Sequence, residues 1–286
     1  MDVVRGPELL DLPQDLPGPV CVIVAPGHSR KLEAAAGRLG LDAGALAALA
    51  GPVRSARTDV TAGSVVLSLW TIDAEGASRS TSMAATDRGL VVVVDDGSVA
   101  DAVARVADGA ADSRRALAQV VLSVAEQTEE HVARLAASTD DLGSGSNGFF
   151  TGEQRRALVA SRARLLRIQH QCAAQQRVLA RDVDLAEAVP GLAAAAERYA
   201  AAADSAAAAY AALGDSLDDL RTTVSERLTI VSTVFLPLTL AGGFFGMNFG
   251  WMADHLDGVT TFVVLGIVLP ILMTAATVQV VRRLSD

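Results

Sequence analysis

A stripe of small and hydroxyl-bearing side chains runs along an uncharged stretch near the C-terminus. The stretch, residues 228–252, reads LTIVSTVFLPLTLAGGFFGMNFGWM. Alternating steps of three and four residues select one face of a helix. Starting at Thr222, these steps select Thr222, Ser225, Thr229, Ser232, Leu236, Thr239 and Gly243. The residues between them are largely Val, Ile, Leu and Phe, so the small and polar groups share one side of the predicted helix.

Such a stripe in an apolar helix has two interpretations. It can allow close packing with hydrogen bonds between helices, or it can form one wall of a water-filled pathway. A second uncharged run, residues 259–281, follows the first. Two membrane helices are too few to enclose a pore alone, so the second interpretation requires several copies of the chain. For a two-span protein in general, packing is the more common arrangement.

The residues that follow the stripe favour a pathway for ions. Gly242, Gly243 and Gly246 allow close approach of backbones or free a carbonyl near the end of the helix. After Gly246 and Met247 comes Asn248, whose side-chain carbonyl is a neutral acceptor that can hold a cation through its water shell. Magnesium keeps several of its waters when it is bound. A ring of neutral oxygens therefore suits the hydrated ion.

Two carboxylates lie just beyond this end, at Asp254 and Asp257. They could raise the local concentration of cations. The alternative is an ordinary solvated loop.

The chain contains two uncharged runs, residues 228–252 and 259–281, and a helix needs about 20 apolar residues to cross a bilayer. Arginines precede the first run (Arg221, Arg227) and follow the second (Arg282, Arg283), whereas the loop between the runs has no basic residue. The positive-inside rule then predicts a multi-pass protein of the cell membrane with both termini in the cytoplasm. No signal peptide is expected, because the N-terminus lacks a basic segment followed by an apolar core.

Composition excludes several other classes of function. The 286 residues carry a formal net charge of −9, which argues against nucleic acid as a partner. Cys21 and Cys172 are far apart and show no CxxC spacing, which fits a reducing compartment. No phosphate-binding or dinucleotide motif is present, so we expect neither an enzyme nor ATP-driven transport. The histidines show no metal-ligand spacing; they are His28, His131, His170 and His255.

The first part of the chain predicts a small α/β domain. Residues 1–19 are proline-rich and predict an irregular lead-in, and residues 28–50 predict one or two short helices broken near Gly40. Short apolar, β-branched runs predict strands. These strands are Val20–Ala25, Val53–Val60, Val65–Ile72, Ser78–Ala85 and Leu90–Val94.

Helices dominate the rest of the chain. Serine N-caps predict helices over Ser98–Asp108 and from Ser113 to about Ser138. A flexible connection, Gly143–Gly148, precedes a helix capped by Thr151 that extends to about Val189. After Pro190 and Gly191 a last helix is expected to run unbroken from Leu192 to Phe245.

The predicted fold class is therefore an α+β cytoplasmic domain followed by two transmembrane helices. The expected parts are the α/β domain (1–97), long cytoplasmic helices including a stalk (98–227), a first span (228–249), an external loop (250–258), a second span (259–281) and a basic tail (282–286).

Charge is unevenly distributed along the predicted helices. Seven arginines and no acid lie between Gln154 and Arg181. The simplest interpretation is pairing with neighbouring helices; the alternative is contact with anionic lipid or with an ion vestibule.

The segment Phe235–Phe249, FLPLTLAGGFFGMNF, with ERLTIVSTV before it and a second span that ends in basic residues, resembles the CorA-type divalent-cation transporters. The resemblance implies a homopentamer with a funnel-shaped cytoplasmic domain, in which the first spans line the pore. It places the ion-selecting entrance on Gly246, Met247 and Asn248, with Asn248 holding the hydrated ion. It also places pore positions on the stripe that begins at Thr222, with Leu236 as the apolar constriction.

Several residues depart from the family pattern. Phe245 stands where the family usually has tyrosine, and Gly250 stands where an acid is frequent. Ser225 is polar at a level that is often apolar, which weakens the case for a dewetting gate there. Only Arg282 and Arg283 form the basic tail. These differences bear on the gate and on ion preference more than on the fold.

The resemblance also implies regulation by cytosolic magnesium through acidic residues between subunits. Two acidic clusters fit this description, although helix caps or solvated turns are the simpler interpretation. The clusters are Asp95–Asp96 and the group Asp182, Asp184 and Glu187.

The function expected from these features is passive uptake of hydrated Mg²⁺, with Co²⁺ and Ni²⁺ as lesser substrates and without a prosthetic group. The bilayer and four further copies of the chain are the expected partners, and Mg²⁺ is also a possible regulator. The alternatives are a proton-coupled Zn²⁺ transporter of the same superfamily and a membrane-anchored sensor or scaffold that does not transport.

Overall fold

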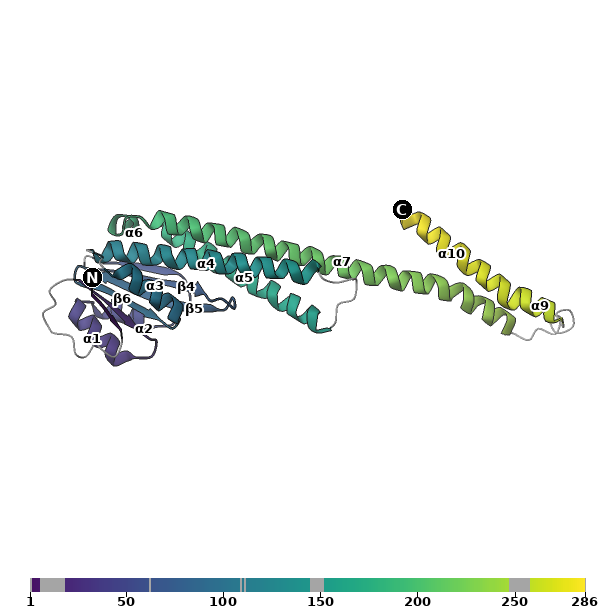
Figure 1. The fold of residues 1–286 in the computed structure, drawn as a ribbon, viewed down its shortest axis with the longest axis horizontal. Helices are drawn as coiled ribbons and strands as arrows, with labels where there is room; N and C mark the ends of the chain where they lie inside the picture. Colours follow the sequence, from purple (N-terminus) through teal and green to yellow (C-terminus); the bar gives the residue numbers. More distant parts are fainter. Residues whose placement is uncertain are drawn as a thin grey trace. The chain divides into compact units, whose positions relative to one another are not determined.

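The computed structural model describes residues 2–5, 19–61, 63–108, 110, 112–144, 152–246 and 258–285 (Figure 1). The chain forms two compact units, Met1–Gly214 and Asp215–Asp286. The first unit contains a sheet with helices on both faces, and the second is helical.

A six-stranded sheet lies at the centre of the first unit. Its strands are β1 (Asp2–Arg5), β2 (Val20–Val24), β3 (Arg57–Val60), β4 (Ser64–Ile72), β5 (Ser78–Thr86) and β6 (Gly89–Val94). They are arranged in the order β1-β2-β6-β5-β4-β3. The pairs β1–β2 and β2–β6 are parallel, and the remaining pairs are antiparallel. All five predicted strands are confirmed, although β3 begins four residues later than expected.

The expectation that residues 1–19 are irregular is wrong for β1. Val4 lies beside Val22 of β2 and is 5% exposed. Two adjacent valines are too short a run to show the alternation that identifies a strand, so this edge strand depends on pairing with a distant segment.

Helices cover both faces of the sheet. Helices α1 (Ser29–Leu39) and α2 (Ala43–Ala50) form one apolar cluster with alternate residues of β2 and β6, including Val22 and Val91. Side chains in a strand alternate between faces, so Cys21 and Val92, which are also fully buried, point to the opposite face. Helices α3 (Gly97–Ala107) and α4 (Ser113–Ser144) pack on that face.

Glycine is required at two turns of this unit. The predicted break near Gly40 is confirmed, since Gly40 ends α1 with a φ of 71°. Gly89 has a φ of 158°, and a Cβ atom there would lie 2.2 Å from the carbonyl oxygen of Val20. A side chain at Gly89 would therefore separate β6 from β2.

The helical layer of the first unit contains α4, α5 (Gly152–Arg181), α6 (Val183–Ala188) and the start of α7 (Leu192–Gly246). The buried face of α5 includes Leu165, Ile168 and Cys172. Tyr199 of α7 is fully buried as well. Burial raises the pKa of the Tyr199 hydroxyl, and the nearby Cys172 adds to this effect. The phenol therefore stays neutral inside the helical layer.

Three helix boundaries differ from the predictions because aspartates provide the caps. At the start of α4 the cap is Asp112, not Ser113, because Asp112 accepts the backbone N–H of Arg114 at 3.1 Å. Asp96, not Ser98, caps α3 by accepting the backbone N–H of Ser98 at 2.8 Å. Helix α5 ends at Arg181, short of Val189, because Asp182 accepts the N–H of Leu185 at 3.0 Å and begins α6. The predicted cap Thr151 and residues 145–148 of the predicted connection lie outside the described residues.

The second unit contains the rest of α7, α9 (Val259–Val263), a π-helical turn η2 (Val264–Val268) and α10 (Leu269–Ser285). Helix α7 is continuous for 55 residues, as predicted. Among the residues that the structure describes, no helix meets the combined length and hydropathy required to cross a membrane. In η2 the N–H of Leu269 bonds to the carbonyl of Val264, five residues earlier.

Candidate functional site

The predicted stripe lies on α7 within the second unit. All seven of its members are exposed on the single chain: Thr222, Ser225, Thr229, Ser232, Leu236, Thr239 and Gly243. Because the helix is unbroken over these residues, the spacing of three and four places them on one face. None of these seven residues is buried by the described part of its own chain.

The threonine hydroxyls of the stripe have a common hydrogen-bond pattern. Thr222 donates to the carbonyl of Asp218 at 3.1 Å, and Thr229 donates to that of Ser225 at 2.9 Å. Thr239 donates to the carbonyl of Phe235 at 2.7 Å. A hydroxyl has one hydrogen and two lone pairs, so an oxygen whose hydrogen is already donated presents acceptors only. Such oxygens suit the outward-pointing hydrogens of the waters around a cation.

Leu236 interrupts the hydroxyl groups of the stripe. Its side chain is 74% exposed and is the largest apolar group on this face. The hydroxyls of Ser232 and Thr239 lie on either side of it along the helix. Leu236 therefore separates two polar levels of the stripe.

The C-terminal end of the stripe is made of glycine. A Cβ atom at Gly242 or Gly243 would meet nothing within 4 Å. Within the described chain these glycines therefore leave space that a neighbouring backbone can approach. Gly246 is the last residue of α7. The other residues predicted at this end lie outside the described residues, namely Met247, Asn248, Asp254 and Asp257.

Large apolar side chains cover the other faces of α7 in the second unit. Leu228 is 62% exposed, Phe235 is 63% exposed and Leu240 is 70% exposed. Helices α9 and α10 also expose apolar groups, among them Val259 and Ile271. Contiguous exposed apolar surface of this kind marks an interaction with lipid or with protein.

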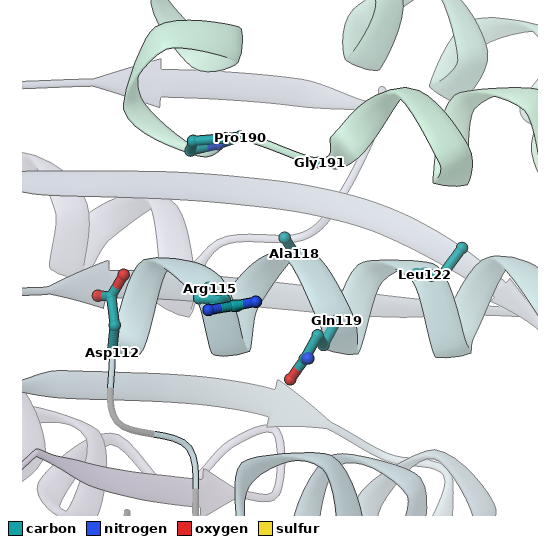
Figure 2. A pocket seen from close by; sticks show the side chains of 7 residues that line it. All are labelled: Asp112, Arg115, Ala118, Gln119, Leu122, Pro190 and Gly191. Atoms are coloured by element: carbon teal, nitrogen blue, oxygen red, sulfur yellow. The ribbon is translucent and has the colours of Figure 1, made fainter.

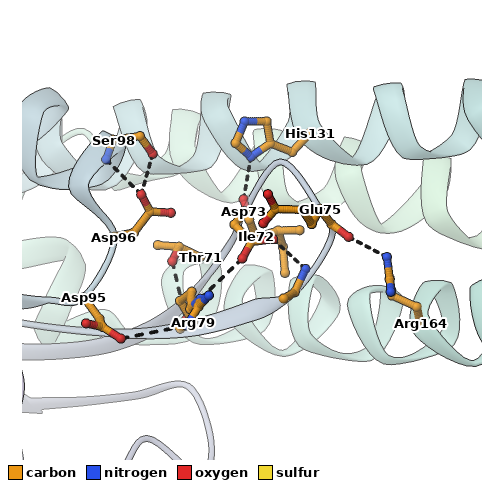
Figure 3. A network of polar contacts seen from close by, with 11 residues as sticks. Thr71, Ile72, Asp73, Glu75, Arg79, Asp95, Asp96, Ser98, His131 and Arg164 are labelled. Carbon is orange, nitrogen blue, oxygen red and sulfur yellow. Dashed lines mark hydrogen bonds and ion pairs between the residues drawn. The ribbon is translucent and has the colours of Figure 1, made fainter.

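The acidic pair Asp95–Asp96 is part of a polar network in the first unit (Figure 3). Arg79 lies 3.3 Å from Asp73 and 3.9 Å from Asp95. Nearby, His131 Nδ1–H donates to the carbonyl of Ile72 at 2.6 Å.

The carboxylate of Asp96 is occupied as a helix cap in this network. Its Oδ1 accepts the hydroxyl and the backbone N–H of Ser98. Partial burial acts to raise the pKa of Asp96, but these hydrogen bonds and the neighbouring His131 outweigh burial and lower it. In the described part of the chain, no three His, Cys, Asp or Glu side chains are grouped as metal ligands.

An open hollow of about 490 Å³ lies beside the start of α4 (Figure 2). Asp112 and Arg115 contribute opposite charges to it, while Pro190 and Gly191 line the other side. The described residues that line this hollow include no cysteine, histidine or serine.

The family described as CorA-like Mg²⁺ transporter protein matches residues 23–283. No curated protein matches the chain in sequence.

Several solved structures share the fold. The full-length CmaX protein is 16% identical with a TM-score of 0.64, and the match covers 97% of this chain and 92% of CmaX. The CorA magnesium transporter from Methanocaldococcus jannaschii is 13% identical with a TM-score of 0.65, covering 92% of this chain and 90% of that one. The ZntB cytoplasmic domain from Vibrio parahaemolyticus RIMD 2210633 is 10% identical with a TM-score of 0.53, covering 66% and 83%.

Proposed function

Since the chain belongs to the CorA-like Mg²⁺ transporter family, we propose that it conducts hydrated divalent cations, Mg²⁺ before Co²⁺ and Ni²⁺, passively into the cytosol. We place it in the cell membrane as a homopentamer with both termini in the cytoplasm. The spans of this proposal are residues 228–249 and 259–281, which carry no charge.

One observation carries the proposal: the exposed stripe on α7 presents hydroxyl oxygens as acceptors. Thr229 and Thr239 each donate their hydrogen to a carbonyl of their own helix. Several copies of this face around a common axis would form rings of neutral acceptors. Such rings hold a hydrated cation through its waters without removing them, which matches the reluctance of Mg²⁺ to dehydrate.

The outer entrance in this proposal is Gly246, Met247 and Asn248, with the amide oxygens of Asn248 arranged as a collar around the hydrated ion. Asp254 and Asp257 would concentrate cations outside the collar. These assignments come from the sequence and from the family pattern.

Leu236 is the proposed constriction. A ring of leucines between rings of hydroxyls would exclude water when narrow and pass a hydrated ion when wide. The membrane potential would then supply the driving force, about 2.3 kcal/mol per elementary charge per 100 mV.

Flux into proteoliposomes that contain a Mg²⁺-sensitive dye tests the function. We expect uptake that follows the imposed potential, and Asn248→Ala should abolish it without changing the oligomer in size-exclusion chromatography. Uptake of Zn²⁺ that requires a proton gradient, with no Mg²⁺ flux, would favour the zinc-transporting alternative. Absence of any flux from a correctly assembled protein would favour a sensor or scaffold.

A further inference from the structure

The neighbouring parallel strands β2 and β6 lead into helices on opposite faces of the sheet. Strand β2 is followed by α1, which packs with Val22 and Val91 on one face. Strand β6 is followed by α3, which packs on the other face. Where two parallel strands diverge in this way, a crevice forms at their carboxyl ends, and ligands of open α/β sheets bind there. The carboxyl ends of β2 and β6 form such a switch point.

A cavity of about 320 Å³ lies at this switch point. It is lined by the loop that follows β2 (residues 25–28), the start of α1, the end of α2 and parts of β5 and β6. Its apolar lining includes Leu32, Leu49 and Val93. Small-molecule sites span about 300–1,000 Å³, so this cavity has room for one small organic molecule.

Serine hydroxyls line the cavity, and one of them is buried. Ser29, Ser80 and Ser82 belong to the lining, and Ser82 is only 3% exposed. The hydroxyl oxygens of Ser82 and the fully buried Ser68 are 3.2 Å apart. Two hydroxyls carry two hydrogens, and only one of them can lie between the oxygens. The described residues provide no acceptor for the other hydrogen, so a buried donor remains, and Ser82 is the member of the pair that reaches the cavity.

The start of α1 adds backbone donors beside the same cavity. No side-chain hydrogen bond caps this helix, and the N–H groups of Ser29 and Arg30 have no acceptor among the described residues. Gly27 has a φ of 82°, and a Cβ atom there would meet nothing within 4 Å. The approach to these N–H groups is therefore open. Free N–H groups and the helix dipole together favour an anion.

The charged residues at the start of α1 favour an anion as well. Arg30 and Lys31, the only lysine of the chain, lie in a first turn that contains no acid. A cation at this end of a helix is unfavourable because the dipole is positive there, and a bound anion would offset the repulsion. His28 lines the cavity next to them, with its Nδ1 3.3 Å from the carbonyl oxygen of Ala25.

We propose that this cavity binds a small phosphomonoester. The N–H groups of Ser29 and Arg30 and the serine hydroxyls donate to the phosphate, while Leu32 and Leu49 contact the organic part. A phosphomonoester presents three strong acceptor oxygens, whereas a carboxylate presents two, so the phosphate uses more of these donors. The loop has a single glycine and does not match the glycine-rich phosphate motifs, so the sequence does not predict the site. The inference goes beyond ion transport and does not depend on it.

Isothermal titration calorimetry of the full chain in nanodiscs, in buffer free of divalent cations, tests this site. Three phosphomonoesters are compared with their dephosphorylated forms: AMP with adenosine, glucose 6-phosphate with glucose, and glycerol 3-phosphate with glycerol. We expect at least one phosphomonoester to bind, and its dephosphorylated form to bind at least about tenfold more weakly, because the charge-assisted hydrogen bonds are lost. Absence of binding by all three at millimolar concentration would overturn the proposal, as would equal affinities within every pair.

A pair of buried serines locates the binding. Ser82→Ala removes the buried donor and should weaken the phosphomonoester about tenfold, the effect of one hydrogen bond to a charged group. Ser64→Ala is the matched control, because Ser64 is also 3% exposed. It lies on the same face as Val66 and pairs with Thr86 at the other end of β5. Its affinity should be unchanged, and an equal loss in both variants would contradict the assigned site.

A charge reversal outside the core gives a second test if Ser82→Ala does not fold. Lys31→Glu should weaken the phosphomonoester severalfold and leave its dephosphorylated form unaffected. Arg88→Glu makes a similar change in the turn before β6, at the other end of that strand, and should have no effect. Affinity that survives both Ser82→Ala and Lys31→Glu would overturn the proposal. Loss of Mg²⁺ flux with this binding intact contradicts only the transport function.

Discussion

The side-chain oxygen of Gln175 accepts the backbone N–H of Trp70 at 2.5 Å, joining helix α5 to strand β4 across 105 residues of sequence. The cause is the short edge strand β3, whose first residue, Arg57, lies opposite Ser68. Beyond that point no described strand pairs with the outer edge of β4, and an unpaired N–H away from water is costly. Gln175, which is 1% exposed, supplies the missing acceptor.

Replacing this glutamine should destabilise the first unit. Gln175→Leu keeps the approximate volume but leaves the N–H of Trp70 unpaired, and we expect the free energy of unfolding to fall by about 1–3 kcal/mol. Urea unfolding followed by tryptophan fluorescence measures the change. Gln169→Leu, at a half-buried position of the same helix, is the matched control. Equal effects of the two substitutions would mean that the Trp70 contact contributes nothing specific.

Removing one hydroxyl from the stripe should reduce ion flux without unfolding the helix. Thr239→Val preserves shape and removes the acceptor oxygen, so we expect Mg²⁺ uptake to fall by about tenfold, the effect of losing roughly 1.4 kcal/mol of ion stabilisation. Thr233 makes the same kind of bond, to the carbonyl of Thr229 at 2.6 Å, but lies off the stripe. Thr233→Val should therefore leave uptake nearly unchanged, and the reverse order of effects would contradict the proposed pore face.

Shortening the proposed constriction should increase the leak of ions. Leu236→Ala widens the apolar ring and makes it easier to hydrate, so basal Mg²⁺ flux should rise, measured with the internal dye at zero imposed potential. Leu240 is also apolar and 70% exposed, but it lies outside the stripe. Leu240→Ala serves as the control, and a leak of the same size from both variants would remove Leu236 from its proposed role.

The capping residue of α3, Asp96, should make the stability of the folded chain depend on pH in the acidic range. Native hydrogen bonds lower the pKa of Asp96 from its ordinary value of 3.8, so the folded state favours the ionised carboxylate. This contribution is present above pH 3.8 and is lost as the pH falls through the lowered native pKa. Asp96→Asn keeps a good capping residue but does not titrate.

Thermal unfolding at a series of pH values checks this expectation. The unfolding temperature of Asp96→Asn should fall less steeply below pH 4 than that of the unmodified chain. Parallel curves would show that other carboxylates determine the acid sensitivity.

Periodic features of the chain were predictable, while features that depend on distant contacts were not. Valine-rich runs predicted β2, β4 and β6 because buried strands favour β-branched residues. Three- and four-residue spacing placed the stripe on one face of α7 because a single long helix preserves that spacing. Strand β1 was not predicted, because Val3 and Val4 form a strand only through their pairing with β2.

The helix caps and the charged side chains likewise depend on distant contacts that the local sequence does not show. Asp96 and Ser98 are both suitable N-caps by type, and only the backbone geometry decides between them. The arginines of α5 predicted ion pairs within the chain, but local sequence does not tell which face of a helix meets a neighbour and which stays outward. Of the candidate site, the stripe lies within the described residues, whereas Met247 and Asn248 lie outside them.

The π-helical turn Val264–Val268 changes how the second predicted span must be interpreted. A π-turn holds one residue more than an α-turn, and each residue of a helix adds about 100° of rotation. Side chains from Leu269 onward are therefore out of phase with those before Val264. A helical periodicity counted from Val259 therefore assigns residues after the turn to the wrong face of the helix. The lipid-facing and protein-facing sides have to be determined separately for the residues before Val264 and for those from Leu269 onward.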